Sequence, residues 1–491
     1  MNAWKKVVFA CIALLALGLI PVGAALAQVR VTAANPASAQ QGTIALDVVV
    51  SGNGFDPSAK VSYFVSGTTN PGGITVRRVA YRNSKELVTT IDVDDAAVLA
   101  YYDIQVTLQS GRKGKGTTLF SVTRKSGSVD SYVAESLGTL PGDQHSEGWG
   151  INSSGRAVGR SSGAETKAFY WDGTMHQLPM STEARTAPPA ETSWDVEARA
   201  ISNGPDEIVV GREERTVCEA NNGPCAPERH PIIWRGNLTQ GPSAIRLSTG
   251  AHPGTGGAEG INPSGTIAVG HLTGAAGAVW KQESGSWNLT DIPLTAFPCN
   301  LCKYDSGVAI DVNDEGLVVG LVSRQDNYLQ YGYLYDTRNG AGMLLPMPPG
   351  YLQSNGRAIV NVAGGKVYVS GVVWPCENIS GCRGSRAVRW TVDVGTFGSS
   401  FELLDMGGGF GVSEQGDVVG TRFSTPGKRK STSTASAFLW RISVGYIPLE
   451  PLRGDPESKT SGLSVGEDGA LYVVGYSMSS TTWSAVRWIV R

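Results

Sequence analysis

The sequence has little of what most catalytic sites are built from. Only 5 of its 491 residues are His, and charged residues make up 17% of the chain. It contains no Gly-x-Ser-x-Gly nucleophile motif, no His-Glu-x-x-His zinc motif and no Asp/Asn-rich calcium loop. We therefore expect no catalytic residue, no metal site and no cofactor.

Long apolar runs and sustained helical periodicity are almost absent as well. The missing helical period excludes a helical solenoid. The one long apolar run, Val7 to Ala25, follows Lys5 and Lys6 and ends in Ala25-Leu-Ala27. This pattern predicts a secretory signal at residues 1–27, cleaved after Ala27. We expect an exported chain with no transmembrane segment once it is mature, located in the periplasm, at the cell surface or in the medium.

Cysteine is scarce but evenly spaced. Outside the predicted signal there are six cysteines, in three close pairs: Cys218/Cys225, Cys299/Cys302 and Cys376/Cys382. An even number in an exported chain favours disulfides, and the short spacings favour these local pairings. The alternative for Cys299-Asn-Leu-Cys302 is a redox motif, but no thioredoxin-like βαβ pattern surrounds it.

A short pattern recurs seven times between residues 148 and 491. Clear copies are Gly150-Ile-Asn-Ser-Ser-Gly-Arg-Ala-Val-Gly159 and Ile310-Asp-Val-Asn-Asp-Glu-Gly-Leu-Val-Val-Gly320. The glycines that close each copy mark a period of about fifty residues: Gly159, Gly211, Gly270, Gly320, Gly371, Gly420 and Gly475. Each copy offers four short strands, in the first copy 148–152, 156–160, 168–171 and 175–180. Four-stranded units at this period predict a seven-bladed β-propeller over residues 132–491, in an all-β protein.

One aromatic residue recurs on the third strand of each predicted blade. The set is Trp171, Trp234, Trp280, Tyr335, Trp390, Trp440 and Trp488. We expect these rings to pack between neighbouring sheets, where a large ring buries much apolar area, rather than to bind a sugar.

The last repeat ends after its third strand. Glu135-Ser-Leu-Gly-Thr-Leu-Pro141 is similar to the missing fourth strand and lies before the first blade. We predict that residues 135–141 complete the last blade, because this would pair two otherwise exposed strand edges.

Residues 29–123 form a separate module. Their short β-branched and aromatic runs alternate with Gly, Asn and Pro turns, which predicts an antiparallel β-sandwich of about seven strands. Residues 124–131 are the predicted linker. The opening Asn35-Pro-Ala-Ser38 and the turn Ser51-Gly-Asn-Gly-Phe55 resemble the Ig-like IPT/TIG family. That resemblance implies a spacer or interaction module.

The repeats resemble the bacterial extracellular HAF family. Ser136-Leu-Gly-Thr-Leu-Pro-Gly142, Gly150 to Gly159, Ala168-Phe-Tyr-Trp171 and Ala437-Phe-Leu-Trp440 match its pattern, although Lys167 and Ser436 replace the family's His. The resemblance covers residues 135–491. It implies a propeller fold and an exported location, and it supplies no catalytic residues.

The predicted loops gather on one face of the ring. Loops that join second to third strands, and fourth to first strands, share a face of a propeller, and all three cysteine pairs fall in such loops. So do the loop from Ser181 to Glu197, which contains Trp194, and a basic loop with Lys428, Arg429 and Lys430. This face is either a recognition surface or a set of restrained loops. The basic run could contact acidic glycans or phosphates, or be a solvated loop.

These observations favour an exported, non-catalytic binding or adhesion protein. We expect a monomer whose partner is an extracellular protein or glycan, and no nucleic-acid ligand. One alternative is a carbohydrate-active hydrolase or lyase with acid and base groups in a central pocket. The other is a structural component of the cell envelope.

Overall fold

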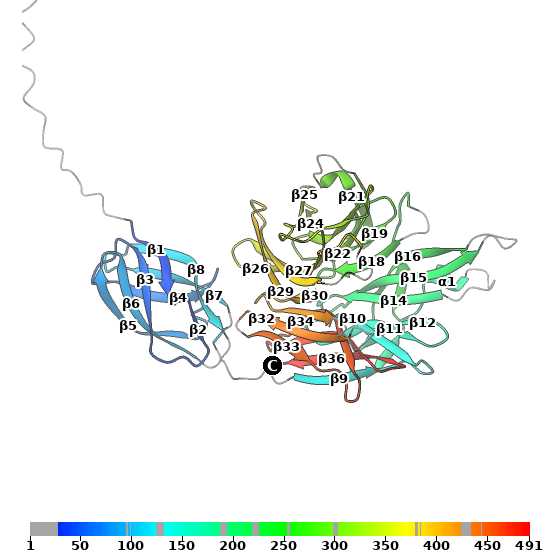
Figure 1. Ribbon diagram of the computed structural model, residues 1–491, viewed down its shortest axis with the longest axis horizontal. Coiled ribbons are helices and arrows are strands. Elements are labelled where there is room, and N and C mark those ends of the chain that lie inside the picture. Colours follow the sequence, from blue (N-terminus) through cyan, green and yellow to red (C-terminus); the bar gives the residue numbers. More distant parts are fainter. Residues whose placement is uncertain are drawn as a thin grey trace, which may run out of the picture. The chain divides into compact units, whose positions relative to one another are not determined.

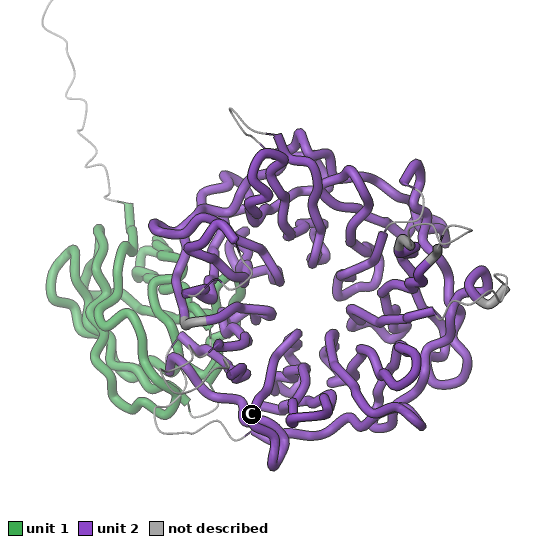
Figure 2. The backbone as a smooth tube through the Cα atoms, turned by 45° about the vertical axis from the view of Figure 1, so that its right-hand side comes forward, with its two compact units in different colours: residues 1–125 green, residues 126–491 purple. Residues whose placement is uncertain are grey.

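A computed structural model describes residues 28–94, 97–98, 100–123, 132–186, 194–218, 225–252, 256–297, 303–378, 382, 384–423, 434–442 and 444–491. The predicted signal, the predicted linker, the cysteines at 299 and 302 and the basic run at 428–430 lie outside these residues. The chain forms two compact units, Met1–Lys125 and Ser126–Arg491 (Figure 2). In the described part of the chain, no helix is long and apolar enough to cross a membrane.

The first unit contains two four-stranded sheets around one apolar core (Figure 1). The first sheet has the order β1 (Arg30–Asn35), β3 (Leu46–Asn53), β6 (Glu86–Val93), β5 (Ile74–Asn83). The second has the order β2 (Ser38–Gln40), β8 (Lys113–Thr123), β7 (Tyr101–Thr107), β4 (Lys60–Val65). Tyr63, Leu87 and Phe120 from both sheets are almost fully buried in this core. The unit is therefore a β-sandwich, and its assignment to the IPT/TIG family stays a prediction.

The second unit is a seven-bladed β-propeller: its described residues form seven four-stranded antiparallel sheets arranged as a ring (Figure 2). In the first six sheets the strands follow chain order from the innermost outward (Figure 1). Blades 1 to 3 consist of β10 (His145–Ile151), β11 (Ala157–Ser162), β12 (Thr166–Trp171), β13 (Met175–Gln177); β14 (Trp194–Ile201), β15 (Val209–Cys218), β16 (Cys225–Arg235), β17 (Ser243–Arg246); and β18 (Gly256–Ile261), β19 (Ile267–Leu272), β20 (Gly277–Glu283), β21 (Ser286–Ile292).

Blades 4 to 6 repeat the arrangement. They consist of β22 (Tyr304–Val312), β23 (Leu317–Arg324), β24 (Gln330–Asp336), β25 (Ala341–Leu344); β26 (Gln353–Val362), β27 (Lys366–Trp374), β28 (Arg386–Asp393), β29 (Ser399–Met406); and β30 (Gly408–Val412), β31 (Val418–Phe423), β32 (Ala435–Arg441), β33 (Gly445–Leu449). Two short helices, α1 (Thr182–Thr186) and η1 (Leu294–Ala296), lie in connections between blades.

The last blade combines strands from both ends of the unit. Its order is β34 (Glu457–Val465), β35 (Leu471–Met478), β36 (Trp483–Val490), β9 (Tyr132–Gly138). Arg487 of β36 joins this blade internally and to blade 1, since one guanidinium nitrogen donates to Glu135 at 2.6 Å and another to the Gly155 carbonyl at 2.7 Å. The chain thus closes its ring by backbone pairing and by the contacts of a partly buried cation.

The recurring aromatics link neighbouring blades. Each pairs, across the sheet, with the residue two positions before the glycine that closes the repeat, as Trp171 does with Ala157 and Trp488 with Val473. Four fully buried indoles donate to a carbonyl of the preceding blade at 2.7–2.8 Å: Trp234 to Pro179, Trp280 to Ser248, Trp390 to Pro346 and Trp488 to Glu450. Trp440 differs, because it is only half-buried and lies beside the Arg389 guanidinium.

Candidate functional site

The innermost strand of every blade contains a β-bulge at the same position. In each case one residue is left without a partner between two small or short residues, as Trp149 is between Gly148 and Gly150. A bulge redirects the side chain that it carries. The seven bulged residues all line one cavity, of about 660 Å³, on the axis of the ring: Trp149, Arg199, Glu259, Ile310, Arg357, Phe410 and Ser461.

The glycine that closes each repeat makes room for the bulge beside it. A Cβ atom added to Gly270 would lie 1.9 Å from the Gly257 carbonyl oxygen, and the corresponding distance in the other six blades is 1.9–2.2 Å. Any side chain would overlap the backbone of the innermost strand. The closing glycine, which is the same in all seven repeats, therefore leaves room for the bulged residue, which varies between repeats and lines the channel.

A network of charges lies beside the channel on blades 1 to 3. The Arg160 guanidinium bridges Glu147 at 2.7 Å and Glu197 at 2.9 Å. Glu197 also binds Arg199 at 2.7 Å and Arg212 at 2.9 Å. Since each of these guanidinium groups has a carboxylate within 3 Å, the network largely neutralises itself.

Trp149 lies against this network. The guanidinium carbons of Arg199 and Arg160 lie 3.9 Å and 4.8 Å from its ring centroid. Its indole N–H donates to Glu147 at 3.3 Å. Two cations and one hydrogen bond thus hold the ring at the channel wall.

Glu259 remains ionised in the channel. Burial raises its pKa, but His271, 3.4 Å away, and the charges of Arg199 and Arg212 outweigh burial and lower the pKa to about 2. Its carboxylate therefore keeps its negative charge throughout the physiological range.

Arg357 on the opposite side of the channel has no such partner. Its Nε is buried and donates to no acceptor, and no carboxylate among the described residues forms an ion pair with it. Its guanidinium lies 6.0 Å from the Phe410 ring centroid. Burial lowers its pKa, and the more distant charge of Glu259 opposes this shift.

Lys459 is a second channel cation that no described carboxylate pairs with. Its Nζ lies 5.6 Å from the ring centroid of Tyr476, and both residues line the cavity. Blades 4 to 7 therefore give the channel a wall of mixed polarity that includes two positive charges without described ion-pair partners.

Asp311 interrupts the repeat. It follows the bulge of blade 4, where the other six blades have Gly or Ala, and it lines the cavity. Its two oxygens accept the backbone N–H groups of Val312 and Ile359, both at 2.9 Å. Burial outweighs these hydrogen bonds and raises its pKa from 3.8 to about 7.

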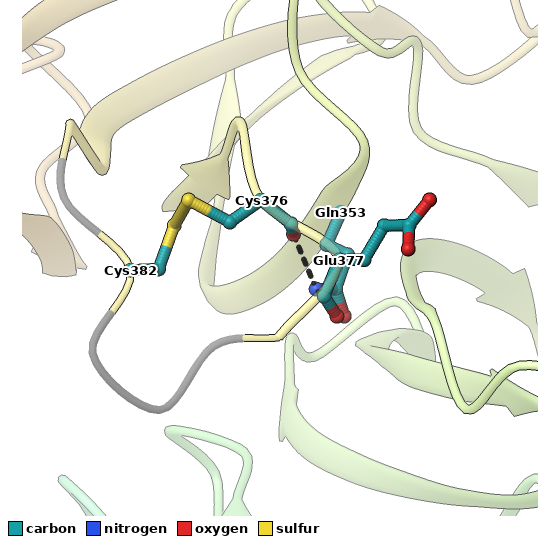
Figure 3. Close-up of a disulfide and its surroundings, with 4 residues drawn as sticks. All are labelled: Gln353, Cys376, Glu377 and Cys382. Carbon is teal, nitrogen blue, oxygen red and sulfur yellow. Dashed lines mark hydrogen bonds between the residues drawn. A yellow bond between two sulfur atoms is a disulfide. The ribbon is translucent and has the colours of Figure 1, made fainter.

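A disulfide braces the strand that carries Arg357. Cys376 and Cys382, the pair that the spacing favours, are bonded within the loop between β27 and β28. The buried Gln353 at the start of β26 donates to the Cys376 and Glu377 carbonyls at 2.8 Å and 2.9 Å (Figure 3). The loop is thereby fixed to β26, four residues before Arg357.

The other residues proposed for the loop face have different outcomes. Cys218 and Cys225 are direct register partners of β15 and β16, while their side chains lie outside the described residues. The prediction that Trp194 lies in a loop is wrong, and its place on a binding face stays a prediction. Trp194 begins β14, is only 9% exposed, and packs beside Arg215 and Arg246. Two cations bury this ring as part of the blade, because their stems and guanidinium faces cover it.

Sequence reasoning missed the bulged residues. Their only signal is a variable position between two small residues, directly before the conserved-looking Ile-Asn of the hairpin, as in Ala258-Glu259-Gly260-Ile-Asn. The usual alternation of side chains between the two faces of a strand does not show which way such a residue points. A bulge interrupts this alternation, and it forms only when two strands pair.

The comparisons with known proteins give no family. No family model matches the sequence, and no curated protein matches it. Solved structures that it is similar to include a Trypanosoma rangeli sialidase in complex with the inhibitor DANA, at 10% identity and TM-score 0.34, covering 78% of this chain and 57% of that one. A tricorn protease matches at 9% identity and TM-score 0.27, over 87% and 36%. A DUF4784 family protein from Bacteroides caccae matches at 13% and 0.25, over 89% and 98%.

This chain spans a little over half the length of the sialidase. At these identities and TM-scores none of the three carries an activity over to this chain, and the propeller fold follows from its own seven sheets.

Proposed function

We propose that this chain is an exported binding protein that takes its ligand into the central channel of the propeller. The observation that carries the proposal is the set of seven bulges, which turn seven side chains of six residue types into one cavity. Its volume of about 660 Å³ falls within the range of about 300 to 1,000 Å³ that is usual for small-molecule sites. A ring whose scaffold repeats while its channel residues vary is suited to recognition.

Export remains part of the proposal. It is supported by the signal-like sequence at residues 1–27 and by the Cys376–Cys382 disulfide, since such bonds persist in oxidising compartments. We also propose that the repeats belong to the HAF type, and that the first unit is an IPT/TIG spacer that carries the propeller. An extracellular glycan fits the mixture of aromatic, hydroxyl and charged groups in the channel.

The test begins with a glycan array on the mature protein, followed by two variants. Ser461→Trp puts into the channel the side chain that blade 1 already carries at the equivalent bulge, so the fold should accept it. We expect this variant to lose binding of the glycan selected by the array. Deleting the loop residues 426–431 should leave binding unchanged.

The matched control is Ser399→Trp, at an exposed position of β29 outside the cavity. It should bind the selected glycan like the wild type. Retained binding by Ser461→Trp, together with loss after the loop deletion, would move the site from the channel to the loop face and contradict the proposal.

A second candidate function is acid–base catalysis in the same channel. Glu259 on β18 and Asp311 on the neighbouring β22 both line the cavity, and their pKa values of about 2 and about 7 lie far apart. Pairs of carboxyl groups with separated pKa values are a usual arrangement of base and acid. Release of reducing or unsaturated ends from a polysaccharide, abolished by Asp311→Asn, would favour this candidate over simple binding.

A further inference from the structure

We propose that the channel recognises a carboxylate-bearing sugar, whose carboxylate binds the guanidinium of Arg357. This inference rests on the proposed function and names the class of its ligand. It follows from three properties of the channel: a partly buried cation without an ion-pair partner, carboxyl groups that disfavour a more highly charged ligand, and aromatic and hydroxyl groups elsewhere on the same cavity wall.

A partly buried guanidinium without an ion-pair partner is costly to the folded protein. Removing a charge from water disfavours the fold unless a partner compensates it. The chain supplies such partners elsewhere in the ring, since Arg160 and Arg212 each have a carboxylate within 3 Å. Arg357 lines the same cavity, and no carboxylate among the described residues forms an ion pair with it. A group that the fold leaves uncompensated is a candidate for recognising a ligand of opposite charge.

The surrounding charges favour a monoanion. Glu259, Asp311 and Glu414 also line the cavity, and Glu259 lies close enough to influence Arg357 electrostatically. A phosphate dianion entering this space would meet those carboxyl groups. A carboxylate carries a single charge, and the planar guanidinium matches it with two parallel hydrogen bonds.

The rest of the wall fits a sugar ring. Phe410 and Tyr476 line the cavity with aromatic rings, on which the C–H face of a sugar can stack. Asn203, Ser413 and Ser461 offer amide and hydroxyl groups to sugar hydroxyls. Lys459 supplies a second positive charge across the apolar wall.

The contacts that hold β26 in place also fix the position of Arg357 on this strand. Gln353, four residues before Arg357, anchors the disulfide loop through two hydrogen bonds. A bidentate contact tolerates little displacement, so a fixed strand favours it.

The experiment titrates the full mature protein with D-glucuronate and D-galacturonate by calorimetry and ligand-observed NMR. The neutral probes are D-glucose and the methyl ester of D-glucuronate, which keep the ring but remove the charge. We expect the wild type to bind a uronate and to bind the neutral probes at least tenfold more weakly. Arg357→Met should weaken uronate binding by about 10- to 100-fold, the effect of losing one charge-assisted contact.

Two further variants keep the result interpretable. Arg357→Lys retains the charge without the planar fork, so its affinity should fall between those of the wild type and Arg357→Met. Arg453→Met, at an exposed position outside the cavity, should bind like the wild type. Arg357→Met should melt no lower than the wild type, because it removes a partly buried charge that has no ion-pair partner.

Several results would overturn the inference. They are equal binding of the acid and its methyl ester, no uronate binding at millimolar concentration, uronate binding that survives Arg357→Met, and displacement of the uronate by inorganic phosphate more readily than by acetate. If the wild type does not bind the uronates and Ser461→Trp still loses binding of the array glycan, the ligand class is wrong and the channel remains the site. If Ser461→Trp still binds the array glycan, the proposed function itself is wrong.

Discussion

Arg357 differs from the neighbouring channel arginines in its lack of an ion-pair partner among the described residues. Every other arginine discussed in the channel network has a carboxylate within 3 Å, and their charges cancel locally. Arg357 has none, and burial lowers its pKa. A cation without a partner is costly to the fold, and this cost supports the proposal that Arg357 binds an acidic ligand.

Asp311 should make stability depend on pH. Its pKa of about 7 in the folded chain exceeds the ordinary 3.8, so between these values the folded chain holds a proton that the unfolded chain has released. The contribution of Asp311 to the free energy of unfolding is therefore fully present below about pH 4 and is lost as the pH rises through about 7. We expect Asp311→Asn to gain about 2 to 4 kcal/mol over the wild type between pH 5 and pH 8, measured by urea unfolding across that range.

Asp336 provides a control of opposite sign. Burial raises its pKa, but hydrogen bonds from Arg338, at 2.8–2.9 Å, outweigh burial and lower it. Asp336→Asn should therefore lose stability relative to the wild type at neutral pH and approach it in acid. Parallel pH profiles for the wild type and Asp311→Asn would show that the Asp311 carboxyl is not held neutral.

The closing glycine of a repeat should be irreplaceable. An alanine at Gly270 would bring its Cβ to 1.9 Å from a backbone oxygen of β18, which cannot move without disrupting the bulge. We expect Gly270→Ala to lower the free energy of unfolding by about 2 to 4 kcal/mol. Gly204→Ala has no heavy atom within 4 Å of its added Cβ and should change little. Equal effects in thermal denaturation would refute the steric argument.

The strands themselves were predictable, and the bulges were not. Val-Val-Gly runs, hairpin turns such as Asn152 to Gly155 and the recurring aromatics each report a local preference that the sequence displays directly. A bulge belongs to two strands at once, and the close approach of Gly270 to Gly257 appears only when they pair. The sequence therefore predicts the strand order but leaves the channel residues unassigned.

The inter-blade indole hydrogen bonds should contribute measurably to stability. Trp234→Phe removes the donor that reaches the Pro179 carbonyl in blade 1 at 2.7 Å. We expect a loss of about 1 to 3 kcal/mol beyond the loss of packing, because a buried acceptor stays unpaired. Trp287→Phe is the matched control, since the buried Trp287 Nε1 has no hydrogen-bond partner. Urea unfolding of both variants measures the difference, and similar losses would mean that packing alone matters.

The pairing of β9 with β36 ties the beginning of the propeller to its end. Their register runs from Tyr132 opposite Val490 to Gly138 opposite Ala485. The similarity of residues 135–141 to a fourth strand predicts this pairing, whereas no local signal reports the Arg487 contacts that reach both β9 and blade 1. Closure of this kind removes two open strand edges.

Truncation separates closure from mere attachment of the first unit. Removing residues 28–125 deletes one compact unit and should leave the melting temperature of the propeller unchanged. Removing residues 28–141 also deletes β9 and should lower that temperature strongly, because blade 7 loses a strand. Differential scanning calorimetry compares the two, and equal melting temperatures would show that β9 does not hold the ring together.

The ring is regular in its scaffold and asymmetric in its channel. Blades 1 to 3 contribute a neutralised charge network, while blades 4 to 7 contribute Ile310, Phe410 and the cations without ion-pair partners. This asymmetry supports the proposed recognition role of the channel, since identical blades would surround the axis with identical side chains. The Cys376–Cys382 loop, on the face that the sequence predicts as a binding surface, is joined to β26 through Gln353, while the binding role of that face stays a prediction.

A crystal structure of the mature protein with the glycan selected by the array tests the central claim most directly. The account predicts the ligand inside the channel, in contact with bulged residues and with an acidic group on the Arg357 guanidinium. A ligand bound to the loops of the disulfide-bearing face, with the channel free of it, would contradict the account.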